Sequence, residues 1–325
     1  MGVFDISGNN LQNTVYDING NQLQQAYDIE GDALFDTGII TVPDSSTGTY
    51  AGYSFTMDNT SNLYLTREVA DFMSESPNLQ SFCYDSDRDV FYRFDATETV
   101  RVYDSSMQLL RTVTMPSIAG HNNDATYFNG KVYMTSGIAI DVGIWVWDVV
   151  ANTVTSIPVN GVVQPTNGSL RMMAGIFKIE GDNNTFILAY QDYRSDDELH
   201  HEPDDMWSIY YYSLSSNNAV LKAEFPWDCY AVQGVAMYDG IIYATCNYQT
   251  EDMTAANQYK GILLKVVRTD TWSEIDSLLA LGTVEPESLN IYPFGTNPEF
   301  MMGVGKYNAV SKIVRFTIPY RLIES

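Results

Sequence analysis

Two stretches of the sequence decide the fold: Ala125-Thr-Tyr-Phe-Asn-Gly-Lys-Val-Tyr133 and Ala236-Met-Tyr-Asp-Gly-Ile-Ile-Tyr243. In each, two short strand-like runs flank an Asn-Gly or Asp-Gly pair, the pattern of a two-residue β-hairpin turn. Looser copies occur at Phe82–Tyr92, Ile176–Leu188 and Leu289–Met302. The unit therefore recurs roughly every 40 to 55 residues, which is the period of a propeller blade.

A second hairpin follows most copies of the first. The segments Val100–Val113, Ile144–Ile157, Ile209–Ala223 and Leu263–Ile275 alternate apolar and polar residues with a period of two, as half-buried strands do. Each unit then has four strands, and we predict an all-β chain that forms a β-propeller. Five units are well formed, whereas a sixth, Tyr53–Thr66, lacks the second hairpin. We therefore predict five blades and keep six as the alternative.

The last unit indicates how the ring closes. It has only three strands before the chain stops, and Gly38–Val42 could supply the fourth by pairing with Lys312–Ile318. A blade shared between the two ends of the chain removes an exposed sheet edge. Helix is expected only in two short connectors, at Glu68–Ser74 and Ser273–Leu281.

The first residues carry a repeat of much shorter period. Val3-Phe-Asp-Ile-Ser-Gly8 is followed by Val15-Tyr-Asp-Ile-Asn-Gly20 and by Tyr27-Asp-Ile-Glu-Gly31. Each copy predicts a short strand and a glycine turn, and three such hairpins bury little apolar surface. They need to stack on themselves, on another subunit or on a docking partner. We therefore divide the chain into an attachment strip, residues 1–36, and a propeller, residues 37–325.

The charge of the chain limits its partners. Asp and Glu outnumber Lys and Arg by 41 to 17, which gives a net charge of −24 at pH 7. Such a field repels phosphate backbones and anionic lipid surfaces, so neither nucleic acid nor a membrane is expected as a partner. Metal cations, neutral glycans and basic protein surfaces remain. The three cysteines are widely spaced and predict buried free thiols.

Propeller geometry brings distant loops together. The loops that lead into each innermost strand share one face with the loops that join the second strand to the third. This face rings the central axis, where propellers usually bind ligands. It should hold the polar run Gly120-His-Asn-Asn-Asp124, the acidic loop 192–205 and several aromatic side chains. Our candidate ligand-binding residues are His121, Asn122, Asp124, Tyr193, Trp207 and Tyr248.

The chemistry of these residues leaves alternatives open. His121 and Asp124 could bind a metal, orient a glycan or transfer protons, or His121 could contact the next blade while Asp124 caps a turn. The loop 192–205 could hold Ca²⁺ or a transition metal, but its spacing is not that of an EF-hand, and a solvated acidic loop is the default. Asp85-Ser-Asp-Arg-Asp89 resembles a calcium run within a hairpin turn, where Asp and Ser satisfy the backbone. No cofactor is expected, with Ca²⁺ as the one candidate.

Catalytic motifs do not support an enzyme. The sequence contains no phosphate loop, Ser-His-Asp arrangement, CxxC pair or dinucleotide fingerprint. A propeller glycosidase needs carboxylates that project into the channel. Asp124, Glu285 and Glu287 could occupy such positions, but nothing in their spacing pairs them. We therefore lean toward a chain that is not an enzyme.

The three N-terminal units resemble repeats of bacteriophage and prophage tail-associated proteins from gut bacteria, and His121–Tyr133 is similar to propeller segments of such proteins. The resemblance implies a non-catalytic virion protein of the phage tail, made in the bacterial cytoplasm and assembled as a homotrimer. Residues 3–36 would dock on other tail proteins. The propeller would recognise a host-surface glycan or protein, or space other virion parts. The alternative is a glycosidase or lyase that cuts host polysaccharide.

Overall fold

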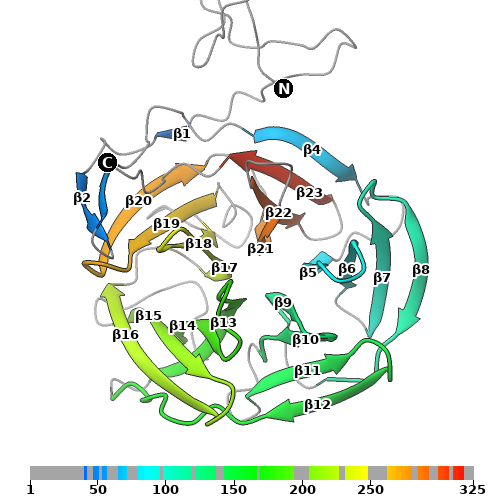
Figure 1. Ribbon diagram of the computed structural model, residues 1–325, viewed down its shortest axis with the longest axis horizontal. Helices are drawn as coiled ribbons and strands as arrows, with labels where there is room; N and C mark the ends of the chain where they lie inside the picture. The colour runs from blue at the N-terminus through cyan, green and yellow to red at the C-terminus, as the bar shows by residue number, and fades with distance from the viewer. Residues whose placement is uncertain are drawn as a thin grey trace, which may run out of the picture.

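The computed structural model describes residues 40–41, 47–50, 53–56, 65–71, 79–95, 98–118, 122–136, 143–166, 169–193, 205–226, 231–247, 262–279, 285–292, 299–306 and 310–317. These residues form four four-stranded antiparallel sheets, one five-stranded sheet and one two-stranded hairpin (Figure 1). They contain strands and no helix, hence no helix that could cross a membrane. The N-terminal repeats lie outside the described residues.

The five larger sheets are the blades, and each is given from its innermost to its outermost strand. Blade 1 consists of β5 (Leu79–Asp85), β6 (Val90–Asp95), β7 (Thr99–Asp104) and β8 (Leu109–Thr114). Blade 2 consists of β9 (Ala125–Phe128), β10 (Lys131–Met134), β11 (Ile144–Asp148) and β12 (Thr153–Ile157). Blade 3 consists of β13 (Leu170–Lys178), β14 (Thr185–Tyr193), β15 (Met206–Ser213) and β16 (Asn218–Pro226). Blade 4 consists of β17 (Val232–Tyr238), β18 (Ile241–Asn247), β19 (Ile262–Arg268), β20 (Ser273–Leu279) and β1 (Ile40–Thr41). Blade 5 consists of β21 (Glu285–Tyr292), β22 (Glu299–Lys306), β23 (Val310–Thr317) and β4 (Leu65–Asp71).

The innermost strands close a ring. Each of β5, β9, β13, β17 and β21 contacts the next one, and β21 contacts β5. Figure 1 shows the blades standing around one axis, with these strands nearest to it. The predicted propeller is confirmed, and the described residues give five blades.

The two hairpin turns that suggested the fold have the expected geometry. Both central residues of each turn have positive φ: 50° and 78° at Asn129 and Gly130, and 50° and 74° at Asp239 and Gly240. This is the conformation of a type I′ turn, whose twist matches that of the flanking strands. The short-range sequence signal was therefore reliable at these two positions.

An N-terminal strand does complete the last blade, but we chose the wrong strand. It is β4 that pairs with β23, with Ala70 opposite Ile313, whereas Ile40 and Thr41 pair with β20 on the outside of blade 4. The two helices expected at Glu68–Ser74 and Ser273–Leu281 were also wrong, because the described parts of these segments are β4 and β20. Pairing with an open sheet edge overrides the local preference of the segment that begins at Glu68.

The expected sixth unit is not a blade. Its first strand belongs to a hairpin of β2 (Thr47–Tyr50) and β3 (Tyr53–Thr56), which pair only with each other in the described part of the chain. A two-stranded hairpin has little apolar surface to bury and cannot replace a four-stranded blade in the ring.

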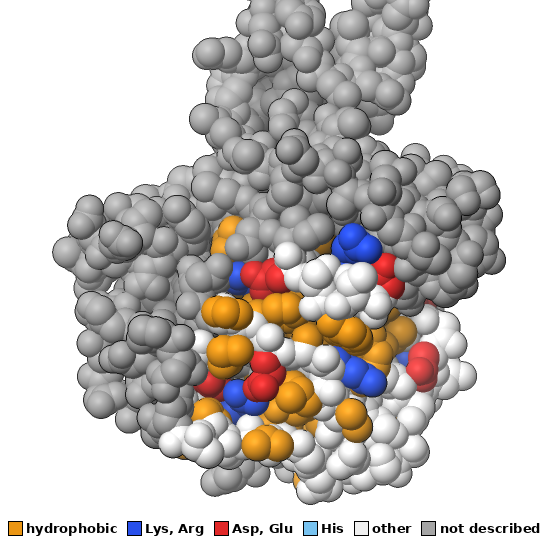
Figure 2. All heavy atoms as spheres, turned by 90° about the vertical axis from the view of Figure 1, so that its left-hand side faces the viewer, with side chains coloured by type: hydrophobic (Ala, Val, Ile, Leu, Met, Phe, Trp, Pro, Cys, Tyr) orange, Lys and Arg blue, Asp and Glu red, His pale blue; other side chains and the backbone are white. Residues whose placement is uncertain are grey.

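Apolar side chains fill the spaces between the blades. Trp147 of blade 2 is buried against Tyr92 and Phe94 of blade 1, with ring centroids 5.3 and 6.0 Å apart. The outer strands are different, since Val220 and Leu221 of β16 are 51% and 39% exposed. Figure 2 shows apolar side chains on this side of the molecule interspersed with charged ones. The core therefore lies between blades and toward the axis.

Closure by β4 predicts the effect of two truncations. Deletion of residues 1–63 keeps β4 and should leave a protein that unfolds in one cooperative transition. Deletion of residues 1–72 exposes the outer edge of β23 and should lower the melting temperature and promote aggregation. Differential scanning calorimetry and light scattering on both truncations would check this. Equal stability of the two proteins would contradict the assignment of β4 as the closing strand.

Candidate functional site

Four of the five innermost strands contain a bulge near the end at which they begin. We call this end of the ring the polar end. Strand pairing shifts between Leu79 and Ser81 in β5, between Met173 and Gly175 in β13, between Val232 and Gly234 in β17, and between Pro286 and Ser288 in β21. Such bulges re-aim the backbone. A small residue follows each shift: Ser81, Gly175, Gly234 and Ser288. Blade 2 instead has a carboxylate, Asp124, immediately before β9.

Asp124 joins four of the five blades through its carboxyl group. Its Oδ2 accepts hydrogen bonds from the backbone N–H of Ile176 in blade 3, at 3.1 Å, and of Val235 in blade 4, at 3.0 Å. Its Oδ1 lies 2.6 Å from the Ser288 hydroxyl of blade 5. The side chain is fully buried. Removing the carboxyl would leave two buried amides without acceptors, at a cost of about 1–3 kcal/mol each.

Asp124, Ser288, Asn290 and the backbone groups that they contact form one hydrogen-bonded group, which we call the axial cluster, and blade 1 is joined to it through Phe82. The Phe82 carbonyl accepts a hydrogen bond from Asn290 Nδ2 at 2.8 Å and lies 3.0 Å from Ser288 Oγ. The Ser288 hydroxyl has one proton, so it donates either to this carbonyl or to Asp124. When Asp124 is ionised, Ser288 donates to the carboxylate. When Asp124 is protonated, it can donate to Ser288 Oγ, which then donates to the Phe82 carbonyl.

Burial controls the protonation of Asp124. Desolvation raises the pKa of this carboxyl from 3.8 to about 7, although the hydrogen bonds from Ser288, Val235 and Ile176 act to lower it. Both arrangements of the axial cluster are therefore accessible near neutral pH.

Close backbone packing around Asp124 explains two of the small residues. A Cβ on Gly234 would lie 2.5 Å from the backbone nitrogen of Leu289, and one on Gly175 would lie 2.9 Å from a methyl carbon of Val235. Blades 3, 4 and 5 thus approach each other too closely for side chains at these positions. This approach brings the amides of Ile176 and Val235 to one carboxyl oxygen.

Most of the buried polar side chains of the described residues lie at the polar end. They sit where innermost strands begin, where second strands end, or where β15 begins. They are Ser81, Arg93, Asp95, Asn122, Asp124, Thr135, Ser136, Ser169, Arg171, Gln191, Asp192, Asp205, Ser208, Gln233, Asn247, Glu287 and Ser288.

The structure places three of the six predicted site residues. Asn122 is at the polar end and is 8% exposed, and among the described residues neither its amide nitrogen nor its amide oxygen has a hydrogen-bond partner. Asp124 is in the axial cluster. Trp207 is fully buried in the apolar cluster between blades 3 and 4, and its indole N–H donates to Glu274 Oε2 at 2.8 Å. Trp207 is therefore a core residue and not part of a ligand face.

The remaining predicted residues are largely outside the described part of the chain. This holds for His121, for Tyr248, for the side chain of Tyr193 and for residues 194–204 of the acidic loop. Among the residues that are described, no group of three or more His, Cys, Asp or Glu side chains could hold a metal ion.

Sequence reasoning missed Arg171, which organises blade 3 at the polar end. Its Nε donates to Asp192 Oδ1 at 2.9 Å, and its Nη1 donates to Tyr210 at 3.1 Å and to Glu224 Oε1 at 2.8 Å. Arg171 is 5% exposed. The sequence offered one signal for Arg171. It lies two residues before Met173 on the same strand, so alternation puts both side chains on the face toward blade 2.

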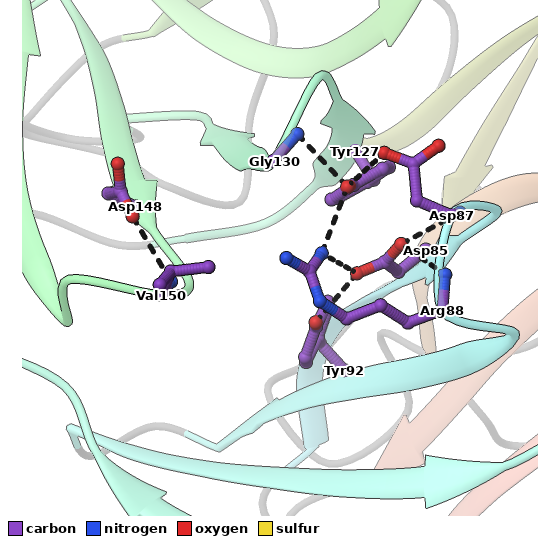
Figure 3. Close-up of polar contacts among 8 residues, drawn as sticks. All are labelled: Asp85, Asp87, Arg88, Tyr92, Tyr127, Gly130, Asp148 and Val150. Carbon is purple, nitrogen blue, oxygen red and sulfur yellow. Dashed lines mark hydrogen bonds and ion pairs between the residues drawn. The ribbon is translucent and has the colours of Figure 1, made fainter.

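At the opposite end, the calcium-like run is a structural turn, as expected. Asp85 accepts hydrogen bonds from the N–H groups of Asp87 and Arg88, at 2.9 and 3.1 Å, and from the Tyr92 hydroxyl at 2.7 Å. Figure 3 shows the Tyr127 hydroxyl of blade 2 between Arg88 and Asp87, at 3.1 and 2.6 Å. These contacts use the acidic side chains to join blade 1 to blade 2.

Replacing Asp124 by Asn should remove a pH dependence of stability. In the wild type the folded state keeps a proton that the unfolded chain releases above about pH 3.8, so the unfolding free energy falls as the pH rises from about 4 to about 7. In Asp124→Asn, the amide can donate to Ser288 and accept from Ile176 and Val235 at every pH. Urea unfolding from pH 4.5 to 7.5 should show the variant gaining on the wild type as the pH rises. Parallel curves would contradict the buried titration.

Gly234→Ala should destabilise the ring, because the added methyl meets the backbone of the next blade. We expect a loss of about 1–3 kcal/mol, the usual effect of overpacking. Gly303→Ala is the matched control, since its Cβ would meet side-chain atoms, the nearest being Leu79 Cδ2 at 3.1 Å. Denaturant unfolding should give a smaller loss for the control. An equal or larger loss in the control would argue against the close approach of blades 4 and 5.

Comparisons with known proteins show no family for this chain. No family model matches the sequence, and no curated protein does. Among solved structures, Kuenenia stuttgartiensis hydrazine synthase is 12% identical with a TM-score of 0.40, over 71% of this chain and 57% of that chain. U3-55K is 13% identical with a TM-score of 0.39, over 74% and 80% of the two chains. The WD40 repeats of RRP9 are 12% identical with a TM-score of 0.41, over 87% and 100%. At these values the similarities identify neither a family nor a function.

Proposed function

We propose that this chain is a non-catalytic component of a phage tail. Residues 3–36 attach it to other tail proteins, and the polar end of its propeller binds a component of the host surface. The observation that carries the binding role is Asn122, whose buried amide group has no hydrogen-bond partner in the part of the chain that the structure describes. An amide that is neither solvated nor bonded is costly, and a ligand that supplies both missing hydrogen bonds offsets that cost.

The tail location rests on the sequence. The three repeats that begin at Val3, Val15 and Tyr27 resemble those of phage tail-associated proteins and bury too little surface to stand alone. A short repeat strip that needs a partner suits a docking segment, and a homotrimer would let three strips stack on one another.

The binding role rests on how the ring distributes its polar groups. The described buried polar side chains gather mainly at one end of the ring, while apolar side chains fill the spaces between blades. The innermost strands of all five blades begin at this end. A host-surface glycan or protein is the ligand class that we favour, because amides and hydroxyls offer directional hydrogen bonds on an otherwise acidic molecule.

The rival glycosidase role has less support. Asp124, one of its candidate carboxylates, is fully buried, and its two oxygens contact Ile176, Val235 and Ser288. A general acid or nucleophile must reach the substrate. Glu287, the second described candidate, is 5% exposed.

Incubation of the full chain with surface polysaccharide and cell-wall fractions of gut bacteria tests the proposal. Both the retained protein and the released reducing ends are measured. We expect retention without release, and Asn122→Ala should weaken retention at least about tenfold, the loss expected when two hydrogen bonds disappear. Asn183→Ala, an exposed residue of the turn between β13 and β14, is the control and should bind normally. New reducing ends would instead support the enzyme, and no retention would leave only a spacer role.

A further inference from the structure

The Ser288 hydroxyl of the axial cluster has two acceptors and one proton. Its Oγ lies 2.6 Å from Asp124 Oδ1 and 3.0 Å from the Phe82 carbonyl oxygen. It also accepts a hydrogen bond from Asn290 Nδ2 at 3.3 Å. Because a hydroxyl donates one proton, Ser288 can form a full hydrogen bond to Asp124 or to Phe82, and not to both.

The surroundings of Asp124 determine where the proton of its neutral carboxyl lies. Oδ2 accepts hydrogen bonds from the backbone N–H groups of Ile176 and Val235, at 3.1 and 3.0 Å, so a proton on this oxygen would face two donors. The proton therefore lies on Oδ1 and is donated to Ser288 Oγ. Ser288 must then direct its own proton to the Phe82 carbonyl. When the carboxyl is ionised, Ser288 donates to Oδ1 and Phe82 loses this hydrogen bond.

The groups that exchange this hydrogen bond belong to three blades. Phe82 is in β5 of blade 1, and Ser288 and Asn290 are in β21 of blade 5, which contacts β5. Asp124 lies just before β9 of blade 2. The Phe82 carbonyl thus receives hydrogen bonds across the contact between blades 1 and 5, from Asn290 at 2.8 Å and, in one of the two arrangements, from Ser288. The second of these bonds depends on a carboxyl group of a third blade.

We propose that Asp124 is a proton-sensitive switch, whose ionisation moves the Ser288 hydrogen bond from the Phe82 carbonyl to the carboxylate and so loosens the contact between blades 1 and 5. The bonds from Ile176 and Val235 become charge-assisted in the ionised state, so blades 3 and 4 are held more firmly. Burial raises the pKa of Asp124 to about 7, which puts the exchange in the neutral range. The switch is independent of the proposed function, because it requires no ligand.

Other ionisable groups lie on β9, on the strands that contact it and on the strands of the axial cluster. Among the described residues they are Tyr127 in β9, Cys83, Tyr84 and Asp85 in β5, Lys131 and Tyr133 in β10, Arg171 and Lys178 in β13, Tyr238 in β17, and Glu285, Glu287 and Tyr292 in β21. Burial raises the pKa of the Cys83 thiol well above its usual value, and the charges of Asp85 and Asp124 raise it further, so the thiol stays neutral. Glu287 adjoins Ser288 and is 5% exposed, so it needs a control of its own.

One NMR signal reports the hydrogen bonding of the Phe82 carbonyl. The pair Phe-Cys occurs once in the sequence, at Phe82-Cys83, so the deuterated full chain labelled with carbonyl-13C phenylalanine and 15N cysteine gives one carbonyl–amide correlation. We expect its 13C signal to move upfield as the pH rises from about 5.5 to about 8.5, because the carbonyl loses a hydrogen bond as Asp124 ionises. The midpoint should equal that of the Asp124 carboxyl, followed by side-chain 13C labelling of aspartate. A carbonyl signal that does not move while Asp124 titrates would overturn the proposal.

Three variants separate the hydrogen-bond relay through Ser288 from other effects of charge. In Asp124→Asn the side-chain amide donates to Ser288 at every pH, so the Phe82 signal should stay at its low-pH position. In Ser288→Ala the carboxyl still titrates, but no hydroxyl links it to the carbonyl, and the Phe82 signal should not follow. If it followed as in the wild type, the charge would act through space and the switch would be refuted. Glu287→Gln is the control and should keep the wild-type amplitude, whereas a loss of amplitude would assign the titration to Glu287 instead.

Hydrogen exchange tests the loosened contact without any change at Ser288. After correction for the intrinsic effect of pH, exchange of the β5 amides in the wild type should rise between about pH 6 and about pH 8 by more than exchange of the β14 amides in blade 3. Asp124→Asn should show equal changes in the two strands. If β5 and β14 respond equally in the wild type, ionisation does not release blade 1 and the proposal fails.

Discussion

The five-bladed ring depends on hydrogen bonds to one buried carboxyl group. Asp124 accepts bonds from the backbone of blades 3 and 4 and contacts the Ser288 hydroxyl of blade 5, and Ser288 and Asn290 extend the cluster to the Phe82 carbonyl of blade 1. The N–H groups of Ile176 and Val235 and the Phe82 carbonyl come directly after the bulges in β13, β17 and β5, and the cluster supplies their hydrogen-bond partners. One acidic side chain therefore supplies hydrogen-bond partners for backbone groups that closing a small ring would otherwise leave unpaired.

The axial cluster also distinguishes polar groups that hold the fold together from polar groups that could bind a ligand. Asp124 is fully used, and the ion pairs of Arg93 and Arg171 are internal to blades 1 and 3. The amide group of Asn122, whose two polar atoms lack a hydrogen-bond partner among the described residues, is uncharged. The site that we propose lies at the polar end, which also contains the axial cluster.

Period and turn chemistry were enough to predict the propeller, since Asn129-Gly130 and Asp239-Gly240 adopt the conformations that their sequences favour. The strand that closes the ring was harder to predict, because the place of β4 is set by pairing with the open edge of β23 and not by its own sequence pattern. At the site, the sequence identified Asp124 and Asn122 but not their separate roles, which depend on contacts with residues far along the chain, such as Val235 and Ser288. Trp207 was misassigned because its side of the strand, shared with Ile209, faces the core between blades 3 and 4.

Hydrogen–deuterium exchange on the wild type and on Asp124→Ala would measure how far the five blades depend on this carboxyl group. If Asp124 holds the blades together, its removal should raise exchange at once in the innermost strands β13, β17 and β21, while the outer strands β8, β12 and β16 of the same protein keep their protection. An increase that is confined to β9 and its neighbours in blade 2 would contradict the account, because it would mean that the other blades do not depend on this carboxyl group.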